Sequence, residues 1–192
     1  VWHVARPVPE PAMLARAVEV LRGARKPLLV AGGGVIYSEA TGALAALVDA
    51  TGIPVAETYA GKGAMPYDHP SALGAIGVTG TDGANAMARE ADVVVGVGTR
   101  WADFATASHS IFADPGVRFV NVNVAPVDAF KHAATPVVAD AREALTGALA
   151  GWATDEDWRQ AAAGHNRDWD ATVERVYRAG HGPLPSGVFV AP

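Results

Sequence analysis

The sequence predicts an α/β domain with a doubly wound, mostly parallel sheet that carries helices on both faces, followed by a C-terminal helical tail. Short runs made only of apolar residues recur along the chain, and segments of helical length separate them. Such runs are typical of strands buried on both faces, which belong to parallel sheets with helical crossover connections. The first run ends in three consecutive glycines, as in the strand-to-helix turn of Rossmann-like folds. The 192 residues suffice for one compact domain.

The first part of the chain is expected to form a helix, a strand and a second helix. Apolar residues recur at helical spacing over 9–25, which predicts an amphipathic first helix. The apolar run 28–31 predicts the first buried strand, and Gly32-Gly33-Gly34 follows it as a glycine turn. Ser38 is a good N-cap for the next helix, and Gly52 is placed to close that helix in the left-handed conformation.

The middle of the chain is less regular. A second strand is expected over 53–56. The periodicity then fails over 57–80, where glycines and prolines predict a long loop with one short strand within 73–78. An alanine-rich helix is expected over 81–91, and the run 92–98 is the clearest buried strand of the sequence.

The last part supplies two strands and two helices. Apolar and polar residues alternate over 119–124, which predicts a strand, and a shorter strand is expected over 136–139. Asp140 is expected to cap a helix that runs through Leu145 and Leu149. A charged and aromatic helix follows over 155–178. We therefore expect a domain over 1–151, a helical tail over 152–182 and a linker over 183–192.

The composition excludes several classes of protein. Acidic residues outnumber basic ones by 20 to 15, and the net charge of −5 has the wrong sign for binding a phosphate backbone, so no nucleic-acid partner is expected. The absence of cysteine removes disulfides, thiolate zinc sites and iron–sulfur clusters, and it fits a reducing compartment such as the cytoplasm. The longest apolar runs fall short of the ~18–20 residues of a membrane helix, so no membrane partner is expected.

The glycine turn is the first candidate site. Backbone N–H groups of Gly32-Gly33-Gly34 could cradle a phosphate at the point where a strand turns into a helix. The match to the dinucleotide fingerprint is partial, because Tyr37 occupies the position of its third glycine. Glu57 lies about where a ribose-binding acid would follow. A tight glycine turn without a ligand is the competing interpretation.

The second candidate site lies in 96–103, at the carboxyl end of the expected central strand, where open α/β sheets bind their ligands. Arg100 could pair with a phosphate or carboxylate, and Asp103 could hold Arg100. Trp101 could stack on a flat ring, and Asn123 ends the neighbouring strand. The competing interpretation is an Arg–Asp pair that only fixes a loop.

The remaining candidates do not form a catalytic centre. No histidine has metal-ligand spacing to another histidine or to a carboxylate motif, so no metal site is expected. No serine lies in a nucleophile elbow. Lys62, between two glycines, is either an anion contact or an exposed loop residue.

Several segments resemble the central domain of thiamine-diphosphate-dependent enzymes. The similarity runs from about Val1 to Tyr177, and its strongest segments are 1–4, 27–41, 57–63, 98–104, 119–124, 128–132 and 138–142. Within this family, the neighbourhoods of Tyr37-Ser38-Glu39 and Lys131-His132 are most similar to the branch that hydrolyses a cyclic diketone in myo-inositol catabolism.

The resemblance implies that thiamine diphosphate and Mg²⁺ are bound outside these residues. In such enzymes a first domain supplies the activating glutamate, and a third domain supplies the Gly-Asp-Gly and Asn residues that hold the metal and diphosphate. This chain matches neither motif, and Asp82 is interpreted as a helix-start acid. The resemblance also implies that the partners are the other two domains of the same chain, that 183–192 leads to the third, and that the parent is a homo-oligomer.

In some relatives the central domain holds FAD or ADP, and the positions that the resemblance assigns to this role are Gly32, Gly33, Gly34, Gly98, Thr99, Arg100 and Asn123. Three hypotheses follow. The chain is the central domain of a C–C bond hydrolase and is inactive alone; or it is a nucleotide-binding module for FAD, ADP or NAD; or it is a bracing domain of another thiamine-diphosphate enzyme, such as an acetolactate-synthase-like protein. No residue of this chain is expected to be catalytic.

Overall fold

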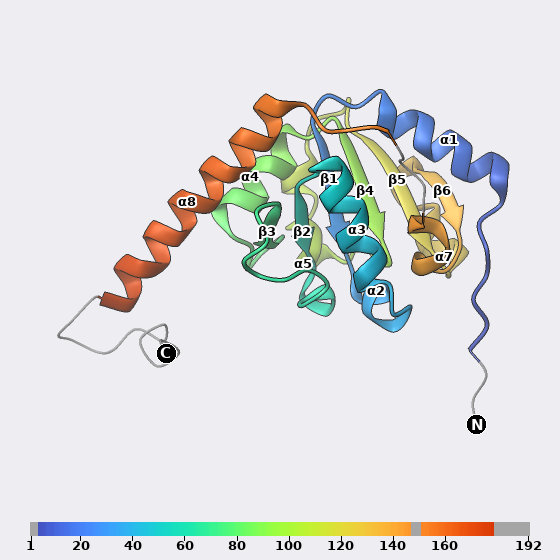
Figure 1. The fold of residues 1–192 in the computed structure, drawn as a ribbon, viewed down its shortest axis with the longest axis horizontal. Coiled ribbons are helices and arrows are strands. Elements are labelled where there is room, and N and C mark those ends of the chain that lie inside the picture. Colours follow the sequence, from blue (N-terminus) through green and yellow to red (C-terminus); the bar gives the residue numbers. More distant parts are fainter. Residues whose placement is uncertain (1–3, 147–150, 179–192) are drawn as a thin grey trace.

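The computed structural model describes residues 4–146 and 151–178, and it confirms the expected α/β architecture (Figure 1). Six strands form one sheet in which every pair is parallel, in the order β3-β2-β1-β4-β5-β6. The strands are β1 (Pro27–Ala31), β2 (Val55–Glu57), β3 (Ala72–Ala75), β4 (Val93–Val97), β5 (Arg118–Asn123) and β6 (Thr135–Val138). This is the doubly wound order, and its switch point lies between β1 and β4, where open sheets bind ligands.

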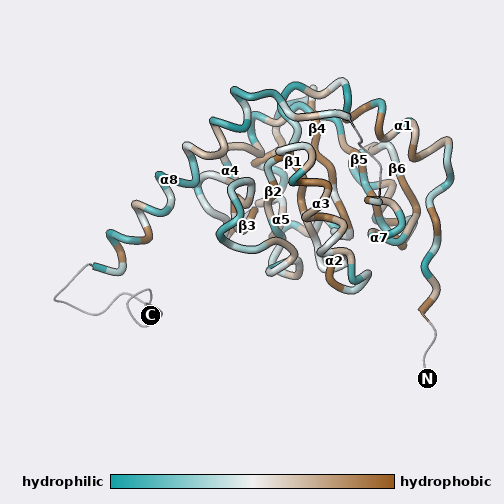
Figure 2. The backbone as a smooth tube through the Cα atoms, viewed as in Figure 1, coloured by the Kyte–Doolittle hydropathy of each residue, from teal (hydrophilic) through white to brown (hydrophobic). Residues whose placement is uncertain are grey.

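The two faces of the sheet each pack against their own group of helices. Alternate residues of β1 separate the cores: Leu29 and Ala31 belong to one, and Leu28 and Val30 to the other. The first core is closed by α1 (Pro11–Arg22), α3 (Thr41–Thr51) and α7 (Ala141–Leu145), and the second by α4 (Asp82–Glu90) and α8 (Glu156–Arg178). Burial on both faces explains the unbroken apolar runs, and the tube through the central strands is mostly hydrophobic (Figure 2).

Short helices occupy several of the connections that follow the strands. They are α2 (Gly33–Tyr37), η1 (Tyr59–Gly61), α5 (Asp103–Thr106), η2 (Ser110–Phe112), α6 (Pro126–Ala129) and η3 (Lys131–Ala133). The loop expected over 57–80 therefore contains η1 as well as β3.

The prediction that Ser38 caps the second helix is wrong. Ser38 ends the short helix α2, and α3 begins only at Thr41. Glu39 lies between them with a φ of 54°, a left-handed conformation that interrupts the helical path. The other end of α3 is as expected, because Gly52 closes it at a φ of 66°.

Two strands differ in detail from the sequence prediction. β2 begins at Val55, two residues later than expected, although the Pro54 carbonyl still accepts a hydrogen bond of 2.9 Å from the Leu29 amide. β5 alternates apolar and polar residues, yet Asn121 and Asn123 are buried like their neighbours. Their side chains are satisfied internally, so here alternation does not mark a solvent-facing side.

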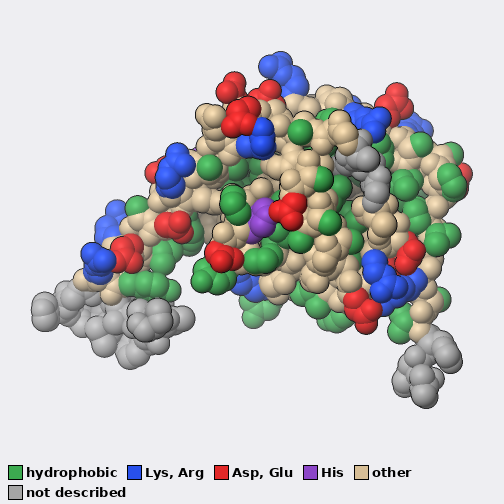
Figure 3. All heavy atoms as spheres, in the orientation of Figure 1, with side chains coloured by type: hydrophobic (Ala, Val, Ile, Leu, Met, Phe, Trp, Pro, Cys, Tyr) green, Lys and Arg blue, Asp and Glu red, His purple; other side chains and the backbone are tan. Residues whose placement is uncertain are grey.

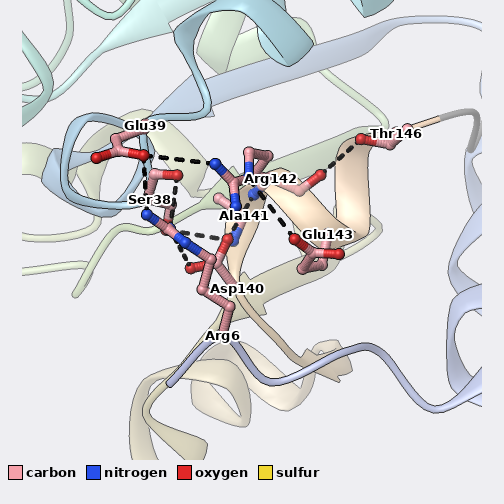
Figure 4. Close-up of polar contacts among 8 residues, drawn as sticks. All are labelled: Arg6, Ser38, Glu39, Asp140, Ala141, Arg142, Glu143 and Thr146. Carbon is pink, nitrogen blue, oxygen red and sulfur yellow. Dashed lines mark hydrogen bonds and ion pairs between the residues drawn. The ribbon is translucent and has the colours of Figure 1, made fainter. Parts of the chain in front are cut away.

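An ionic network ties the N-terminal segment to the domain (Figure 4). The Arg6 guanidinium donates to the Ser38 carbonyl at 2.8 Å and pairs with the carboxylates of Asp140 and Glu39, each at 3.0 Å. Asp140 also caps α7, as the sequence predicts, by accepting from the Arg142 amide at 2.9 Å. One buried carboxylate therefore holds both a helix end and the incoming chain.

The helix expected over 155–178 is α8, and its first half packs on the domain. The Trp158 indole nitrogen donates to the Pro27 carbonyl at 2.8 Å, and Trp158 and Ala162 join the second core. A Cβ added to Gly83 of α4 would lie 2.8 Å from the His165 Cβ, so the two helices touch closely. The division between 1–151 and 152–182 stays a prediction. Leu149 and the predicted linker 183–192 lie outside the described residues.

Within the described residues, none of the helices combines the length and the apolar composition that crossing a membrane requires.

Candidate functional site

A hollow of about 780 Å³ lies at the carboxyl edge of the sheet, beside the switch point between β1 and β4. The connections after β1, β2, β4 and β5 form its walls. Six of the seven residues that the sequence analysis assigned to a cofactor line it, namely Gly33, Gly34, Gly98, Thr99, Arg100 and Asn123. Gly32 does not. The two separately predicted candidate sites thus form one hollow.

The glycine turn is explained by contact between two backbones. A Cβ on Gly32 would lie 2.3 Å from the Gly98 carbonyl oxygen, and one on Gly34 would lie 2.5 Å from the Gly98 Cα. The amides of Gly32 and Gly34 donate to the carbonyls of Val97 and Gly98 at 2.8 and 3.0 Å. Since both N–H groups are used within the protein, neither is free to cradle a phosphate.

The Arg100–Asp103 pair proposed from the sequence is wrong. Neither side chain has a hydrogen bond or ion pair among the residues that the structure describes, and Asp103 instead begins α5. The Arg100 carbonyl accepts from Lys131 Nζ at 2.6 Å, which fixes the backbone. The guanidinium therefore remains available to an anion in the hollow.

Trp101 cannot act as an exposed stacking platform, because it is only 4% exposed. Its indole nitrogen donates to the Asn121 side-chain oxygen at 2.8 Å. Its ring makes edge-to-face contacts with Phe112 and Phe119 at centroid distances of 5.7 and 5.5 Å. Trp101 thus anchors the loop after β4 in the second core, and this arrangement leaves its neighbours at the wall of the hollow.

Asn123 holds the same wall. Its side-chain nitrogen donates to the Thr99 carbonyl at 3.0 Å, and its oxygen accepts from the Ala125 amide at 3.0 Å. Asn123 therefore connects the loops after β4 and β5. This is a positioning contact within the protein.

Glu57 does not occupy the place of a ribose-binding acid. Its carboxylate turns toward the following loop, where it accepts from the amides of Gly63 and Met65 at 3.1 and 2.9 Å. Lys62 Nζ lies 3.6 Å from the same carboxylate. Glu57 and Lys62 thus organise the loop after β2 and do not line the hollow.

Exposed aromatic residues surround the hollow, and the sequence analysis missed their role. Tyr37 is 84% exposed, Tyr59 is 85% exposed and Phe104 is 46% exposed, and all three line the hollow together with the exposed Val124. Their position in the sequence could have indicated this role, since each of the three aromatic residues follows the carboxyl end of a strand.

Two histidines, His109 and His132, lie next to the residues that anchor the loop after β4, because the His132 ring contacts Trp101 and Phe119. The His132 ring stacks on Phe119 at 4.7 Å and meets the His109 ring at 4.8 Å. Its Nε2 is buried and has no hydrogen-bond partner among the described residues. Burial lowers the pKa of His132, and the neighbouring His109 and Lys131 act in the same direction.

The residues of the hollow do not fit a magnesium-bound diphosphate. Its buried carboxylate, Asp128, is paired with Lys131 Nζ at 2.8 Å. Across residues 4–146 and 151–178, no group of three or more His, Cys, Asp or Glu side chains could hold a metal ion. Mg²⁺ requires oxygen ligands in near-octahedral geometry, and the single carboxylate of this lining, which is already paired with Lys131, does not supply them.

The strand order and the hollow at the switch point define a doubly wound domain of the kind that binds ligands at its carboxyl edge. The family model described as "Thiamine pyrophosphate enzyme, central domain" matches residues 14–147. The chain therefore belongs to this family of central domains.

Named relatives narrow the comparison. The chain is 48% identical over 145 residues to "3D-(3,5/4)-trihydroxycyclohexane-1,2-dione hydrolase 2" of Bacillus cereus, and the match covers 76% of this chain and 22% of that protein. It is 46% identical over the same length to a hydrolase of that name from Bacillus thuringiensis, with the same coverage. The chain thus spans about a fifth of the length of these relatives.

A solved structure supports the fold. The structure described as "X-ray structure of a putative thiamin diphosphate-dependent enzyme isolated from Mycobacterium smegmatis" superposes with a TM-score of 0.63 and 23% identity. The superposition covers 82% of this chain and 31% of that one.

Proposed function

We propose that this chain acts as the central domain of a thiamine-diphosphate-dependent hydrolase that opens trihydroxycyclohexanedione by hydrolysis of a C–C bond in myo-inositol catabolism. The observation that carries the proposal is the 46–48% identity to hydrolases of that name. In this proposal the cofactor, Mg²⁺ and the activating glutamate belong to parts of a longer polypeptide.

The side chains that line the hollow support the proposal that the catalytic groups belong to other parts of the polypeptide. Its walls offer one unpaired cation among the described residues, Arg100, and a carboxylate already paired with Lys131, so no step of the hydrolysis is assigned to these residues. The role left to the chain is positional: it holds the loops that follow β1, β4 and β5 in one rigid arrangement.

The test compares the 192-residue chain with the polypeptide encoded by the full reading frame. Both are assayed for ring opening of the diketone with thiamine diphosphate and Mg²⁺. We expect turnover from the longer polypeptide and none from the chain. Turnover by the chain alone, or no turnover by the longer polypeptide, would overturn the proposal.

A second candidate function is binding of a nucleotide such as FAD, ADP or NAD, and the size of the hollow and the unpaired Arg100 favour it. The arginine is suited to one anionic group, whereas the amides of Gly32 and Gly34 are already occupied. A ligand at a hundredfold excess over its Kd stabilises the fold by roughly 2.7 kcal/mol, so a thermal-shift screen detects binding.

The matched variants for this screen are Arg100→Ala and Arg178→Ala, the latter paired only within α8 as far as the structure describes it. We expect a nucleotide-induced shift that Arg100→Ala abolishes and Arg178→Ala preserves. No shift with any of the three nucleotides would contradict this second function.

A further inference from the structure

Two connections at the carboxyl edge of the sheet meet through a pair of histidine rings. They are the segments 101–109, after β4, and 126–133, after β5, and we call them the paired loops. His109 of the first and His132 of the second lie with their ring centroids 4.8 Å apart. Since the helices in these segments have only three or four residues each, side-chain contacts hold the paired loops together.

Left-handed backbone conformations are concentrated in the paired loops. Among the described residues other than glycine, a positive φ occurs at Glu39 and otherwise only in these loops, at Trp101, Ala107, Ser108, His109, His132 and Ala133. Such conformations are unfavourable for residues with a Cβ, persist only where surrounding contacts impose them, and recur in segments that switch between two states. The paired loops are therefore strained, and loss of the contacts that hold them releases this strain.

The contacts of η3 extend to the wall of the hollow. The Lys131 carbonyl accepts from the Asn121 side-chain nitrogen at 3.1 Å, and the Asn121 oxygen accepts from the Trp101 indole. Lys131 Nζ donates to the Arg100 carbonyl and pairs with Asp128. Because Arg100, Trp101 and Asp128 line the hollow, a displacement of η3 also moves this wall.

The site of the His132 ring suits a neutral imidazole. Its Nε2 is buried without a hydrogen-bond partner among the described residues, and the uncharged rings of Phe119 and Trp101 pack against it at centroid distances of 4.7 and 5.6 Å. An imidazolium carries a charge and donates from both ring nitrogens. A protonated His132 is therefore better accommodated in solvent than in this site.

The charged groups around His132 do not compensate for that cost. Burial lowers the pKa of His132, and the positive charges of His109 and Lys131 act in the same direction. The carboxylates of the paired loops are Asp103 and Asp128. Neither forms an ion pair with His132 within the part of the chain that the structure describes, and Asp128 is already paired with Lys131.

We propose that the paired loops form a proton-operated switch, in which uptake of one proton by His132 separates η3 from the loop after β4 and opens this wall of the hollow. In the closed state the ring is neutral and packs on Phe119. In the open state the imidazolium reaches solvent, the left-handed residues relax, and Lys131 releases the Arg100 carbonyl. Access of a ligand to the hollow thereby depends on pH.

Proton linkage fixes the direction and the size of the effect. The open state has the ordinary pKa of about 6.5 and the closed state a lower one, so the open state binds more protons between these two values. In that range the opening constant rises by up to about tenfold for each pH unit of acidification. It is independent of pH well above 6.5 and levels off below the lowered pKa.

Hydrogen exchange of the indole N–H groups, followed by NMR, tests the proposal. Trp101 and Trp158 are a matched pair, because each is 4% exposed and each donates a hydrogen bond of 2.8 Å. Since pH changes the intrinsic exchange of both indoles alike, the ratio of their rates reports opening at Trp101. We expect this ratio to rise by up to about tenfold per pH unit below about 6.5. A ratio independent of pH would overturn the proposal.

A variant without the titrating ring assigns the proton. His132→Phe keeps a ring beside Phe119 and should make the exchange ratio independent of pH. His165→Phe is the control, because it removes a titratable ring from α8, whose surface carries charged side chains of both signs (Figure 3). It should leave the rise unchanged. A rise that persists in His132→Phe would overturn the proposal.

A second measurement does not depend on how well His132→Phe folds. The sequence has no cysteine, so a single thiol is a clean reporter. Thr106→Cys places it beside the His109 amide, and Thr51→Cys places it in α3, where the threonine is equally buried. Modification by dithiodipyridine, relative to the same thiol in the urea-unfolded chain, should accelerate on acidification at position 106 only. No acceleration there, or equal acceleration at both positions, would overturn the proposal.

Discussion

The backbones of Gly34 and Gly98 are in contact across the switch point of the sheet. Gly98 adopts a φ of 62°, and a Cβ added to it would lie 2.4 Å from the Gly34 Cα. Contact in both directions leaves no room for a side chain on either residue. The two loops that form the base of the hollow therefore act as one unit.

Gly34→Ala should destabilise the protein by about 2 kcal/mol or more, because the added methyl group meets backbone atoms that have no space to move. Gly42→Ala is the control, since a Cβ there meets nothing within 4 Å and alanine favours the helix. Urea unfolding monitored by circular dichroism measures both. Equal stability of the two variants would contradict the contact.

Trp101→Phe should lower the free energy of unfolding by about 1–3 kcal/mol, because the Asn121 oxygen loses its buried indole donor. Trp169→Phe serves for comparison, since Trp169 is half-buried on α8 and its indole has no hydrogen bond among the described residues. That change should stay within about 0.5 kcal/mol. Chemical denaturation provides the values, and a neutral Trp101→Phe variant would refute the anchoring role of the indole.

Arg6→Ala should cost about 1–3 kcal/mol, because the buried Asp140 carboxylate loses a charged partner and the Ser38 carbonyl loses a donor. The exposed pair of Arg178 and Glu174 offers a control, and Arg178→Ala should change stability by less than about 1 kcal/mol. Thermal unfolding of both variants at low ionic strength tests the expectation. A melting temperature of Arg6→Ala equal to that of the wild type would show that the network does not stabilise the fold.

The protein should lose stability on acidification through His132. Its pKa is lowered in the folded state, so the unfolded chain binds more protons below its ordinary value of about 6.5. The stabilising contribution is complete above that value and is lost as the pH falls toward the lowered pKa. His132→Phe keeps an aromatic ring beside Phe119 and should flatten the decline in stability as the pH falls below about 6.5. An unchanged pH profile would refute this assignment.

Much of the fold could be predicted from the sequence because the signal was local. Unbroken apolar runs located β1 and β4, and Gly52 located the end of α3. The capping role predicted for Ser38 was wrong because Glu39 adopts a left-handed conformation and separates Ser38 from α3. No local pattern in the sequence predicts that conformation. The register of β2 depended on pairing with β1, which is not a local property.

The sequence placed most of the candidate residues at one edge of the sheet, but it did not predict how their side chains are oriented. Chain order placed the residues after β1, β4 and β5 at one edge, and six of them line one hollow. The orientation of each side chain depended on distant partners. Asn121 draws the Trp101 indole into the core, and the amides of Gly63 and Met65 turn Glu57 away from the hollow.

Because α8 is long, a small rotation of the domain moves the far end of this helix by a large distance. At a rise of 1.5 Å per residue, its 23 residues extend about 35 Å, and only the first half lies against α4 while the rest projects beyond the sheet (Figure 1). A tilt of the domain by roughly 5° would displace the far end of such a rod by about 3 Å. A small change in the orientation of the sheet would thus produce a larger displacement at Arg178, the last residue of α8.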